Sequence, residues 1–332
     1  MFFEYIFNEN KEFKKIENFF DFNLNNDEVI VMPKYVGICG SDLFHYLNVK
    51  NSILKLGHEW VGEVHSIGVA VKNISVGDWI TTSATLGCGK CIQCQNMQVN
   101  LCHSPIHLGS TDFGALSSHL KFKAFNAIKL KSKESSQVLV EVLAVAQQAM
   151  KMITGAPRNV LILGAGSVGI LCAELLKNNT SVNEVQILDV SAFRISQAIK
   201  MKHKAQLLSH FLLEQLNPEF DLIIDATNDR TAPGGWKYIN HFGRVGYQAI
   251  IIGKYLKSIE LDSNSFAKKK AQISFMRGVP LDTLNETIEL FSSQLKYLEE
   301  NIITHVYEPE NMQLAIETAL DTSKSIKVVI RL

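Results

Sequence analysis

VLILGAGSVGI, residues 160–170, joins an apolar run of strand character to a turn that contains Gly164, Gly166 and Gly169. This G-x-G-x-x-G spacing allows a tight turn and brings a pyrophosphate close to the N-terminus of the helix that follows. The same glycines also fit an ordinary strand-to-helix turn. The segment therefore predicts a dinucleotide-binding βαβ unit, and the flanking sequence has to support it.

Asp189 supplies that support, because it ends the next apolar strand, EVQILDV, twenty residues after Gly169. A carboxylate at this place accepts hydrogen bonds from the adenosine ribose, which favours NAD, and it repels the 2′-phosphate of NADP. The positive charge of Arg194 would partly offset this repulsion of the 2′-phosphate. The simpler interpretation of Arg194 is a solvated helix residue. Two further residues follow the strand FDLIID at the carboxyl end of the sheet. The predicted cofactor-binding residues are Gly164, Gly166, Ser167, Val168, Gly169, Asp189, Arg194, Ala226 and Thr227.

The order of elements along the 332 residues predicts two domains. Up to residue 141, short apolar runs are broken by Gly, Asn and Asp, which is typical of irregular β structure. Between residues 142 and 276, apolar strands alternate with helical stretches, which predicts an α/β fold with a doubly wound parallel sheet. Two amphipathic helices and a final strand follow. We expect one domain at 1–141 and 277–332 and a second at 142–276.

Charge and composition favour a small-molecule substrate, since Lys plus Arg and Asp plus Glu each number 33. No broad field attracts nucleic acid or an anionic membrane. No apolar run has the length of a membrane span, and the first residues lack the features of a secretory signal. Four of the six cysteines lie within fifteen residues, which favours metal binding over disulfides. We expect a cytoplasmic protein.

The four crowded cysteines, in CGKCIQCQNMQVNLC, are Cys88, Cys91, Cys94 and Cys102, with gaps of two, two and seven residues. Four thiolates can fill the tetrahedral positions of one zinc ion and leave none for substrate, so the predicted role is structural. An iron–sulfur cluster is the main rival, and four unrelated buried cysteines are the plainest alternative. Because Lys90 is the segment's single basic residue, a DNA-binding zinc ribbon is disfavoured.

A second metal site is indicated by Cys39 in GICGSDLFHY and His58 in LGHEWVGEV. Each residue alone is more often a packed or hydrogen-bonded side chain. A cysteine, a histidine and one carboxylate would leave an open zinc position for substrate, and Glu59 and Glu141 are the candidate carboxylates. Glu59 can join His58 only where the backbone turns, because adjacent strand residues point to opposite faces. Asp42 is expected to hold the other ring nitrogen of His58.

Taken in order, GICGSD, GHEWVGEV, the cysteine cluster and the glycine motif resemble the zinc-containing medium-chain alcohol dehydrogenase family over nearly the whole chain. Within that family EVLAVAQQA, residues 141–149, resembles the Glu-Pro-Leu segment of the polyol, sorbitol and threonine dehydrogenase-like branch, with Val142 in place of proline. The resemblance implies a GroES-like catalytic domain, a Rossmann NAD-binding domain, and homodimers or homotetramers. It also implies two zinc ions per chain. The implied ligands are Cys39, His58, Glu59 and Glu141 for catalytic zinc, the last directly or through water, and Cys88, Cys91, Cys94 and Cys102 for structural zinc.

The implied reaction is hydride transfer between NAD and a secondary alcohol or polyol, such as a sugar alcohol, its phosphate, or threonine. Ser41, Asp42 and Glu59 are the predicted catalytic residues: zinc lowers the pKa of the alcohol, and Ser41 accepts the proton. The Ser41 hydroxyl fits a turn cap equally well. Phe44 stands where many relatives have a relay histidine, and His45 follows it. Phe44 and Tyr46 either shape the substrate pocket or pack in the core.

Two other functions remain open at this point. A zinc-independent, NADPH-using quinone reductase shares the scaffold, but Cys39, His58 and the cysteine cluster argue against it. A NAD-binding protein that has lost catalysis would explain the altered relay and Val142. Since pocket loops vary on a common scaffold, no single alcohol is predicted.

Overall fold

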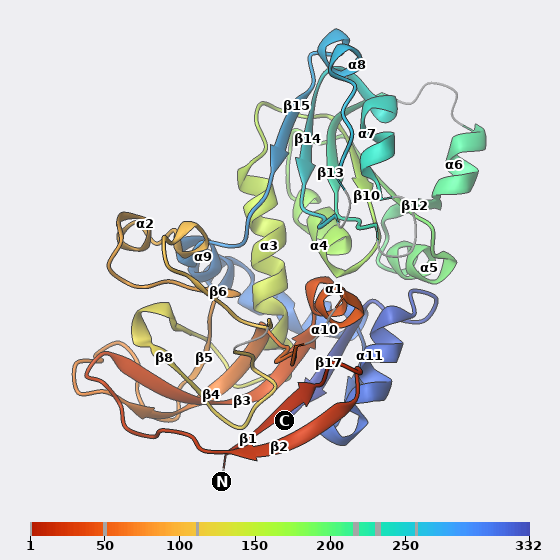
Figure 1. The fold of residues 1–332 in the computed structure, drawn as a ribbon. Coiled ribbons are helices and arrows are strands. Elements are labelled where there is room, and N and C mark those ends of the chain that lie inside the picture. The colour runs from red at the N-terminus through yellow and green to blue at the C-terminus, as the bar shows by residue number, and fades with distance from the viewer. Residues whose placement is uncertain (1, 49–51, 111–112, 215–218, 230–233, 256–257) are drawn as a thin grey trace. The chain divides into compact units, whose positions relative to one another are not determined.

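The computed structural model describes residues 2–48, 52–110, 113–214, 219–229, 234–255 and 258–332. The chain folds into two compact units, each with its own large sheet (Figure 1). Unit 1 comprises Met1–Ala144, Gly278–Asp321 and Lys327–Leu332, and unit 2 comprises Val145–Arg277 and Thr322–Ile326. Within these described ranges, no helix has both the length and the apolar character that crossing a membrane requires.

Unit 2 is built on six parallel strands in the order β12-β11-β10-β13-β14-β15. The chain enters at β10 in the middle, winds to one edge and then to the other. The point where the winding reverses lies between β10 and β13, which is where α/β sheets bind ligands. The strands are β10 (Asn159–Leu163), β11 (Glu184–Asp189), β12 (Lys204–Leu207), β13 (Phe220–Asp225), β14 (Gly243–Ile251) and β15 (Gln272–Phe275). The predicted doubly wound α/β fold is confirmed.

The central strands of this sheet are mostly apolar and buried in continuous runs rather than in alternation, because helices cover the sheet. All six residues of β13 are buried, and Leu161 and Ile223 are completely inaccessible to solvent. Burying one such side chain contributes roughly 1.5–3 kcal/mol. The helices of unit 2 are α4 (Ser167–Leu176), α5 (Ala192–Lys200), α6 (Leu208–Glu214), α7 (Trp236–Phe242) and α8 (Ser263–Lys268).

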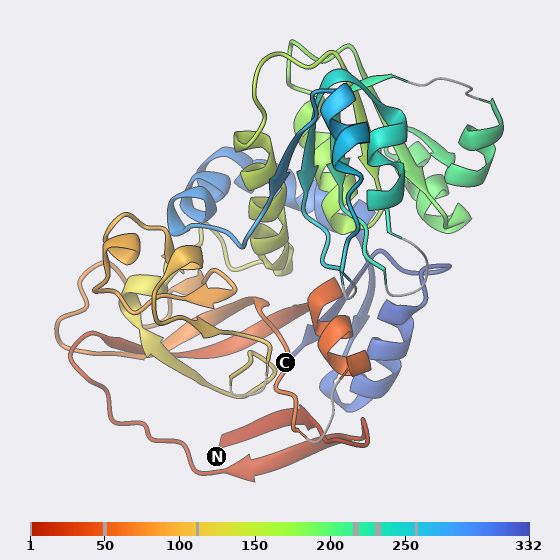
Figure 2. The ribbon, with the colours of Figure 1, turned by 45° about the horizontal axis from the view of Figure 1, so that its top comes forward.

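Unit 1 contains a seven-stranded sheet that is antiparallel except for the pair β16 and β17. Its order is β16-β17-β3-β4-β5-β9, and β8 also pairs with β3. These strands are β3 (Glu28–Ile38), β4 (Glu59–Ile67), β5 (Trp79–Thr81), β8 (Leu120–Lys123), β9 (Ile128–Lys129), β16 (Ile303–Tyr307) and β17 (Lys327–Arg331). Figure 2 shows β1 (Phe2–Phe7) and β2 (Phe13–Asn18) as a separate ribbon. A further small pair joins β6 (Thr85–Leu86) to β7 (Ile106–His107).

The longest strands of unit 1, β3 and β4, position the elements that follow and precede them. Their register pairs Gly37 with Glu59, so the end of β3 lies beside the start of β4. Trp60 packs at the centre of this core with no solvent exposure, and its indole N–H donates to Thr82 Oγ1 at 3.2 Å. The helices are α1 (Gly40–Asn48), α2 (Ile92–Gln95), α9 (Leu281–Phe291), α10 (Leu295–Ile302) and α11 (Met312–Leu320), and α3 (Val140–Lys151) runs from unit 1 into unit 2.

Candidate functional site

The glycine-rich turn after β10 is close-packed in a way that only glycine permits. Gly164 adopts φ of +100°, and an added Cβ would lie 3.0 Å from the carbonyl oxygen of Ala226. An added Cβ on Gly169 would lie 1.8 Å from the Gly164 carbonyl oxygen. Both substitutions would push the turn away from the sheet, so these glycines are required by packing as well as by the turn.

A cavity in unit 2 lies over this turn. Of the predicted cofactor residues it is lined by Gly164, Gly166, Asp189, Arg194, Ala226 and Thr227. The other three, Ser167, Val168 and Gly169, lie in the first turn of α4 outside that lining. The Asp189 carboxylate accepts the Ala165 N–H at 2.6 Å and the Ser191 N–H at 2.8 Å, so it is fixed at the cavity wall.

One wall of this cavity comes from a segment that sequence reasoning missed. Thr322 lines the cavity, and its carbonyl oxygen accepts the Ser191 hydroxyl at 2.6 Å. Arg194 donates from Nε to the Ser325 carbonyl oxygen at 3.1 Å, which excludes its interpretation as a solvated helix residue. Burial lowers the pKa of Arg194, while the charge of Asp189 acts in the opposite direction. No motif marked this segment, because its contacts to the cavity are made through backbone oxygens.

A second cluster forms in unit 1 at the paired ends of β3 and β4. Cys39 follows β3, and His58 directly precedes β4. Gly57, with φ of +96°, takes a left-handed conformation directly before His58 and the first strand residue, Glu59. The candidate ligand atoms of Cys39, His58 and Glu59 all lie within 4.8 Å of one another.

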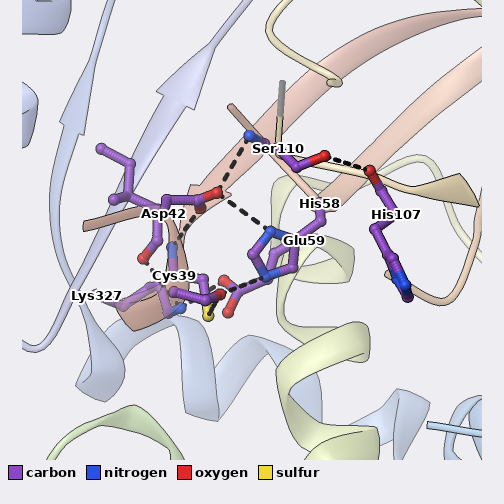
Figure 3. A network of polar contacts seen from close by, with 10 residues as sticks. Cys39, Asp42, His58, Glu59, His107, Ser110 and Lys327 are labelled. Carbon is purple, nitrogen blue, oxygen red and sulfur yellow. Dashed lines mark hydrogen bonds and ion pairs between the residues drawn. The ribbon is translucent and has the colours of Figure 1, made fainter. Parts of the chain in front are cut away.

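The imidazole of His58 is oriented by Asp42, which is buried in the first turn of α1 (Figure 3). Asp42 Oδ1 lies 3.2 Å from His58 Nδ1, and Oδ2 accepts the Cys39 N–H at 2.9 Å. His58 Nε2 is thereby turned toward Cys39, and the Ser41 hydroxyl lies 3.2 Å from both Nε2 and the Cys39 sulfur. Burial alone would lower the pKa of His58, but the charges of Asp42 and Cys39 outweigh it and raise that pKa well above its usual value.

Lys327, the first residue of β17, was not predicted from the sequence. It is 3% exposed, and its ammonium donates to the Glu59 carboxylate and, at 3.3 Å, to the Ile38 carbonyl oxygen. Burial would lower the pKa of Lys327, but Glu59 and Cys39 raise it. The available signal was a single lysine inside the apolar final strand SIKVVI, where an unpaired charge would be costly.

Glu141 lies near this cluster without joining its closest set. It is 4% exposed in the first turn of α3. Burial raises the pKa of Glu141 to about 7, with Glu59 adding to the rise and His58 and Lys327 opposing it. The three ligand atoms that converge are therefore those of Cys39, His58 and Glu59.

The aromatic residues of α1 separate into different surroundings. Tyr46 is buried in the core of unit 1, with its ring edge-on to Phe7 at 5.1 Å, and its hydroxyl accepts from Gln313. It therefore packs rather than lines a pocket. The Phe44 ring is edge-on to His45 at 5.5 Å.

The residues around Cys39 and His58 fit a divalent metal ion. They gather three buried carboxylates, of Asp42, Glu59 and Glu141, against two basic side chains, His58 and Lys327. Ionising the Cys39 thiol would add a further negative charge, and burial of excess charge is unfavourable without a counter-ion. Cysteine, histidine and carboxylate are donors that zinc accepts, so the donor chemistry and the charge balance agree.

The four-cysteine cluster lies in the loop around α2. The sulfurs of Cys88, Cys91, Cys94 and Cys102 all lie within 4.8 Å of one another, and none of these thiols forms a disulfide. Backbone N–H groups of Cys88 and Ser104 each donate to the Cys102 sulfur at 3.3 Å. Hydrogen bonds from the backbone at His103 and Cys94 lower the pKa of Cys91 to about 6, whereas burial raises that of Cys94 to about 12. The arrangement suits one tetrahedral ion.

Solved structures share this fold over their full length. An Escherichia coli alcohol dehydrogenase in complex with NADH superposes with a TM-score of 0.85 at 23% identity, covering 100% of this chain and 99% of that one. Galactitol-1-phosphate dehydrogenase from Escherichia coli gives 0.82 at 20% identity, covering 99% and 100%.

Sequence comparison identifies the family. Residues 25–132 match the alcohol dehydrogenase GroES-like domain. An L-threonine 3-dehydrogenase from Vibrio vulnificus is 27% identical over 308 residues, which span 87% of this chain and 88% of that relative. These matches support the medium-chain family of zinc-containing alcohol dehydrogenases. The predicted resemblance and the GroES-like and Rossmann-like folds are thus confirmed, and this alcohol dehydrogenase family member is an oxidoreductase.

Proposed function

We propose that this protein is a zinc-dependent dehydrogenase that transfers a hydride between a secondary alcohol or polyol and NAD. The observation that carries the proposal is the convergence of Cys39, His58 and Glu59 within 4.8 Å, with His58 and Glu59 buried. Three protein donors leave a position at which a substrate oxygen can bind. A zinc ion held there would lower the pKa of the alcohol hydroxyl toward neutrality.

The side chains around that position have separate tasks. Asp42 holds Nδ1 of His58, so that Nε2 faces the ligand set. Lys327 neutralises Glu59 and fixes its carboxylate beside Cys39. Ser41 Oγ, 3.2 Å from both Cys39 Sγ and His58 Nε2, would accept the alcohol proton and release its own proton to water, to which Ser41 is part-exposed. Glu141 serves as the further carboxylate, buried in the first turn of α3.

The cofactor is proposed to be NAD, bound in the cavity of unit 2. Gly164 and Gly166, at the N-terminus of α4, would bind its pyrophosphate, and Asp189 would accept hydrogen bonds from its ribose. The negative charge of Asp189 disfavours a 2′-phosphate, so NADP is the weaker cofactor. The four-cysteine loop would hold a second, structural zinc ion through Cys88, Cys91, Cys94 and Cys102.

The remaining assignments follow the family. The domains are proposed to be a GroES-like catalytic domain at 1–141 and 277–332 and a Rossmann domain at 142–276. The relatives named for threonine and galactitol 1-phosphate support threonine, a sugar alcohol or its phosphate as substrate. We place the protein in the cytoplasm as a homodimer or homotetramer.

Zinc analysis and a substrate panel test the proposal together. Two zinc ions per chain and NADH formation with one of several polyols, polyol phosphates, threonine or simple secondary alcohols are expected. One zinc ion per chain, without NADH formation, would instead indicate a NAD-binding protein that has lost catalysis. Oxidation of NADPH by quinones in a zinc-free preparation would indicate the quinone reductase alternative.

A further inference from the structure

Asp225, the last residue of β13, is a buried carboxylate that the proposed reaction does not use. It is completely inaccessible to solvent. Its Oδ1 accepts the Thr227 hydroxyl at 2.6 Å and the Thr227 N–H at 3.0 Å, while Oδ2 accepts the Tyr255 hydroxyl. Such a group is retained only when its surroundings satisfy it, so two hydroxyls and one amide are committed to it.

The two hydroxyls are in turn held by consecutive backbone amides. The Gly235 N–H donates to Thr227 Oγ1, and the Trp236 N–H donates to Tyr255 Oη at 3.0 Å. Each hydroxyl therefore accepts from the backbone and donates to the same carboxylate. The result is a closed network that ties the end of β13 to the start of α7 and to the segment after β14.

Packing around this network leaves it little freedom. An added Cβ on Gly235 would lie 2.7 Å from Asp225 Oδ1, and one on Gly234 would lie 2.2 Å from the Tyr255 ring. Both glycines give close contact to the groups that they enclose. Burial, and next the charge of Asp225, raise the pKa of Tyr255 above its usual value, so its hydroxyl stays protonated.

The network ends at the cofactor cavity. Thr227 and Gly235 line that cavity, whereas its lining does not include Tyr255 or Asp225. Thr227 also touches the glycine-rich turn, since its Cγ2 would lie 3.2 Å from a Cβ added to Gly164. The placement of Thr227 against the turn therefore depends on groups behind the cavity wall.

We propose that Tyr255 is a positioning residue for the dinucleotide: through Asp225 it fixes Thr227 and Gly235 in the geometry that binds the cofactor. This inference rests on the proposed function, because it concerns the same cavity. Tyr255 itself is not among the residues that line the cavity proposed for the cofactor. It acts by hydrogen bonding to Asp225 and the Trp236 amide. Its removal would therefore loosen the cavity wall without removing a direct contact to the cofactor.

Tyr255→Phe tests the proposal, with Tyr247→Phe as the matched control. Tyr247 is fully buried in the same unit and its hydroxyl donates to Asn240 at 3.3 Å, but it does not line the cavity or touch Asp225. Dissociation of NADH is measured by fluorescence titration, alongside the thermal midpoint without cofactor and the zinc content. We expect about tenfold weaker NADH binding for Tyr255→Phe, within twofold of wild type for Tyr247→Phe, and unchanged zinc content in both.

The outcomes separate the two claims. If the wild-type protein itself does not bind NADH, the proposed function fails. If it binds and Tyr255→Phe binds within twofold of wild type, or if both variants weaken binding equally, the positioning role is overturned. Should Tyr255→Phe not fold, Asp225→Asn keeps the side-chain volume and one acceptor oxygen; unaltered NADH binding by that folded variant would equally overturn the proposal.

Discussion

The two cysteine-containing clusters of unit 1 are built in opposite ways. The four-cysteine loop draws all its donors from fifteen consecutive residues, and Cys88 and Cys91 are part-exposed. The Cys39 cluster draws its groups from the ends of β3, β4 and β17 and from two helices, and its carboxylates are buried. A loop of this kind needs a metal to hold its shape, whereas the strand ends are held by the sheet itself. Removing a ligand should therefore damage folding in the loop and chemistry in the strand cluster.

Cys94→Ser should have the largest effect on stability. Cys94 is the fully buried cysteine of the loop, and its sulfur faces the three other sulfurs that would share the metal ion. We expect one zinc ion to be lost and the free energy of unfolding to fall by more than about 4 kcal/mol. Urea unfolding with zinc analysis measures both. Retention of full stability after loss of that zinc would contradict a structural role for the loop.

Lys327→Met should be the next most damaging change. It leaves the Glu59 carboxylate buried without its ammonium partner, and breaking a buried pair from one side costs about 3–5 kcal/mol. We expect this loss of unfolding free energy in chelator-treated protein and a smaller loss in zinc-loaded protein, because a cation beside Glu59 also neutralises it.

The double variant Lys327→Met with Glu59→Gln is the control for that experiment. Removing both charges should restore most of the stability in chelator-treated protein, since no unpaired charge is left in the core. Equal losses in the double and single variants would show that Lys327 acts through packing rather than through charge.

Cys39→Ser should separate chemistry from folding. We expect turnover to fall by more than about 100-fold. Loss of a residue that only hydrogen-bonds to a metal ligand lowers activity by at most about that factor. One zinc ion per chain should remain, NADH should still bind, and the thermal midpoint should change little, because the sheet keeps the strand ends in place. An active Cys39→Ser enzyme that lacks the zinc ion proposed at the Cys39 cluster would overturn the proposed mechanism.

The same contrast explains what the sequence could predict. The glycine turn, Asp189 and the four cysteines are each read from a short stretch, and the structure brings each set together. The sequence predicts that Glu59 joins His58 only if the backbone turns there. The structure brings the two side chains together directly after the left-handed Gly57. Local spacing is sufficient where one loop or one βαβ unit supplies all the groups.

Groups that reach a site from distant strands carry no such spacing. Lys327 is 268 residues from Glu59, and Tyr255 is 30 residues from Asp225. Ser325 contributes only a backbone oxygen, which any residue has. Each is defined by strand register and packing, so a buried lysine or tyrosine in an apolar run is recognisable as unusual but not assignable to a partner.

Asp42→Asn should give the smallest effect, and it tests how far the strand cluster is held together by its surroundings. The amide keeps the volume and can still accept the Cys39 N–H, but it no longer carries the charge that faces His58. Loss of such an outer partner lowers metal affinity by about 10–100-fold.

Competition of the variant with a zinc chelator measures this. Asp78→Asn is the control, because Asp78 directly precedes β5 and pairs with Lys129 of the edge strand β9. Equal zinc affinity in Asp42→Asn and wild type would mean that the sheet alone orients His58. Strand register, without any contribution from α1, would then be what distinguishes the Cys39 cluster from the four-cysteine loop.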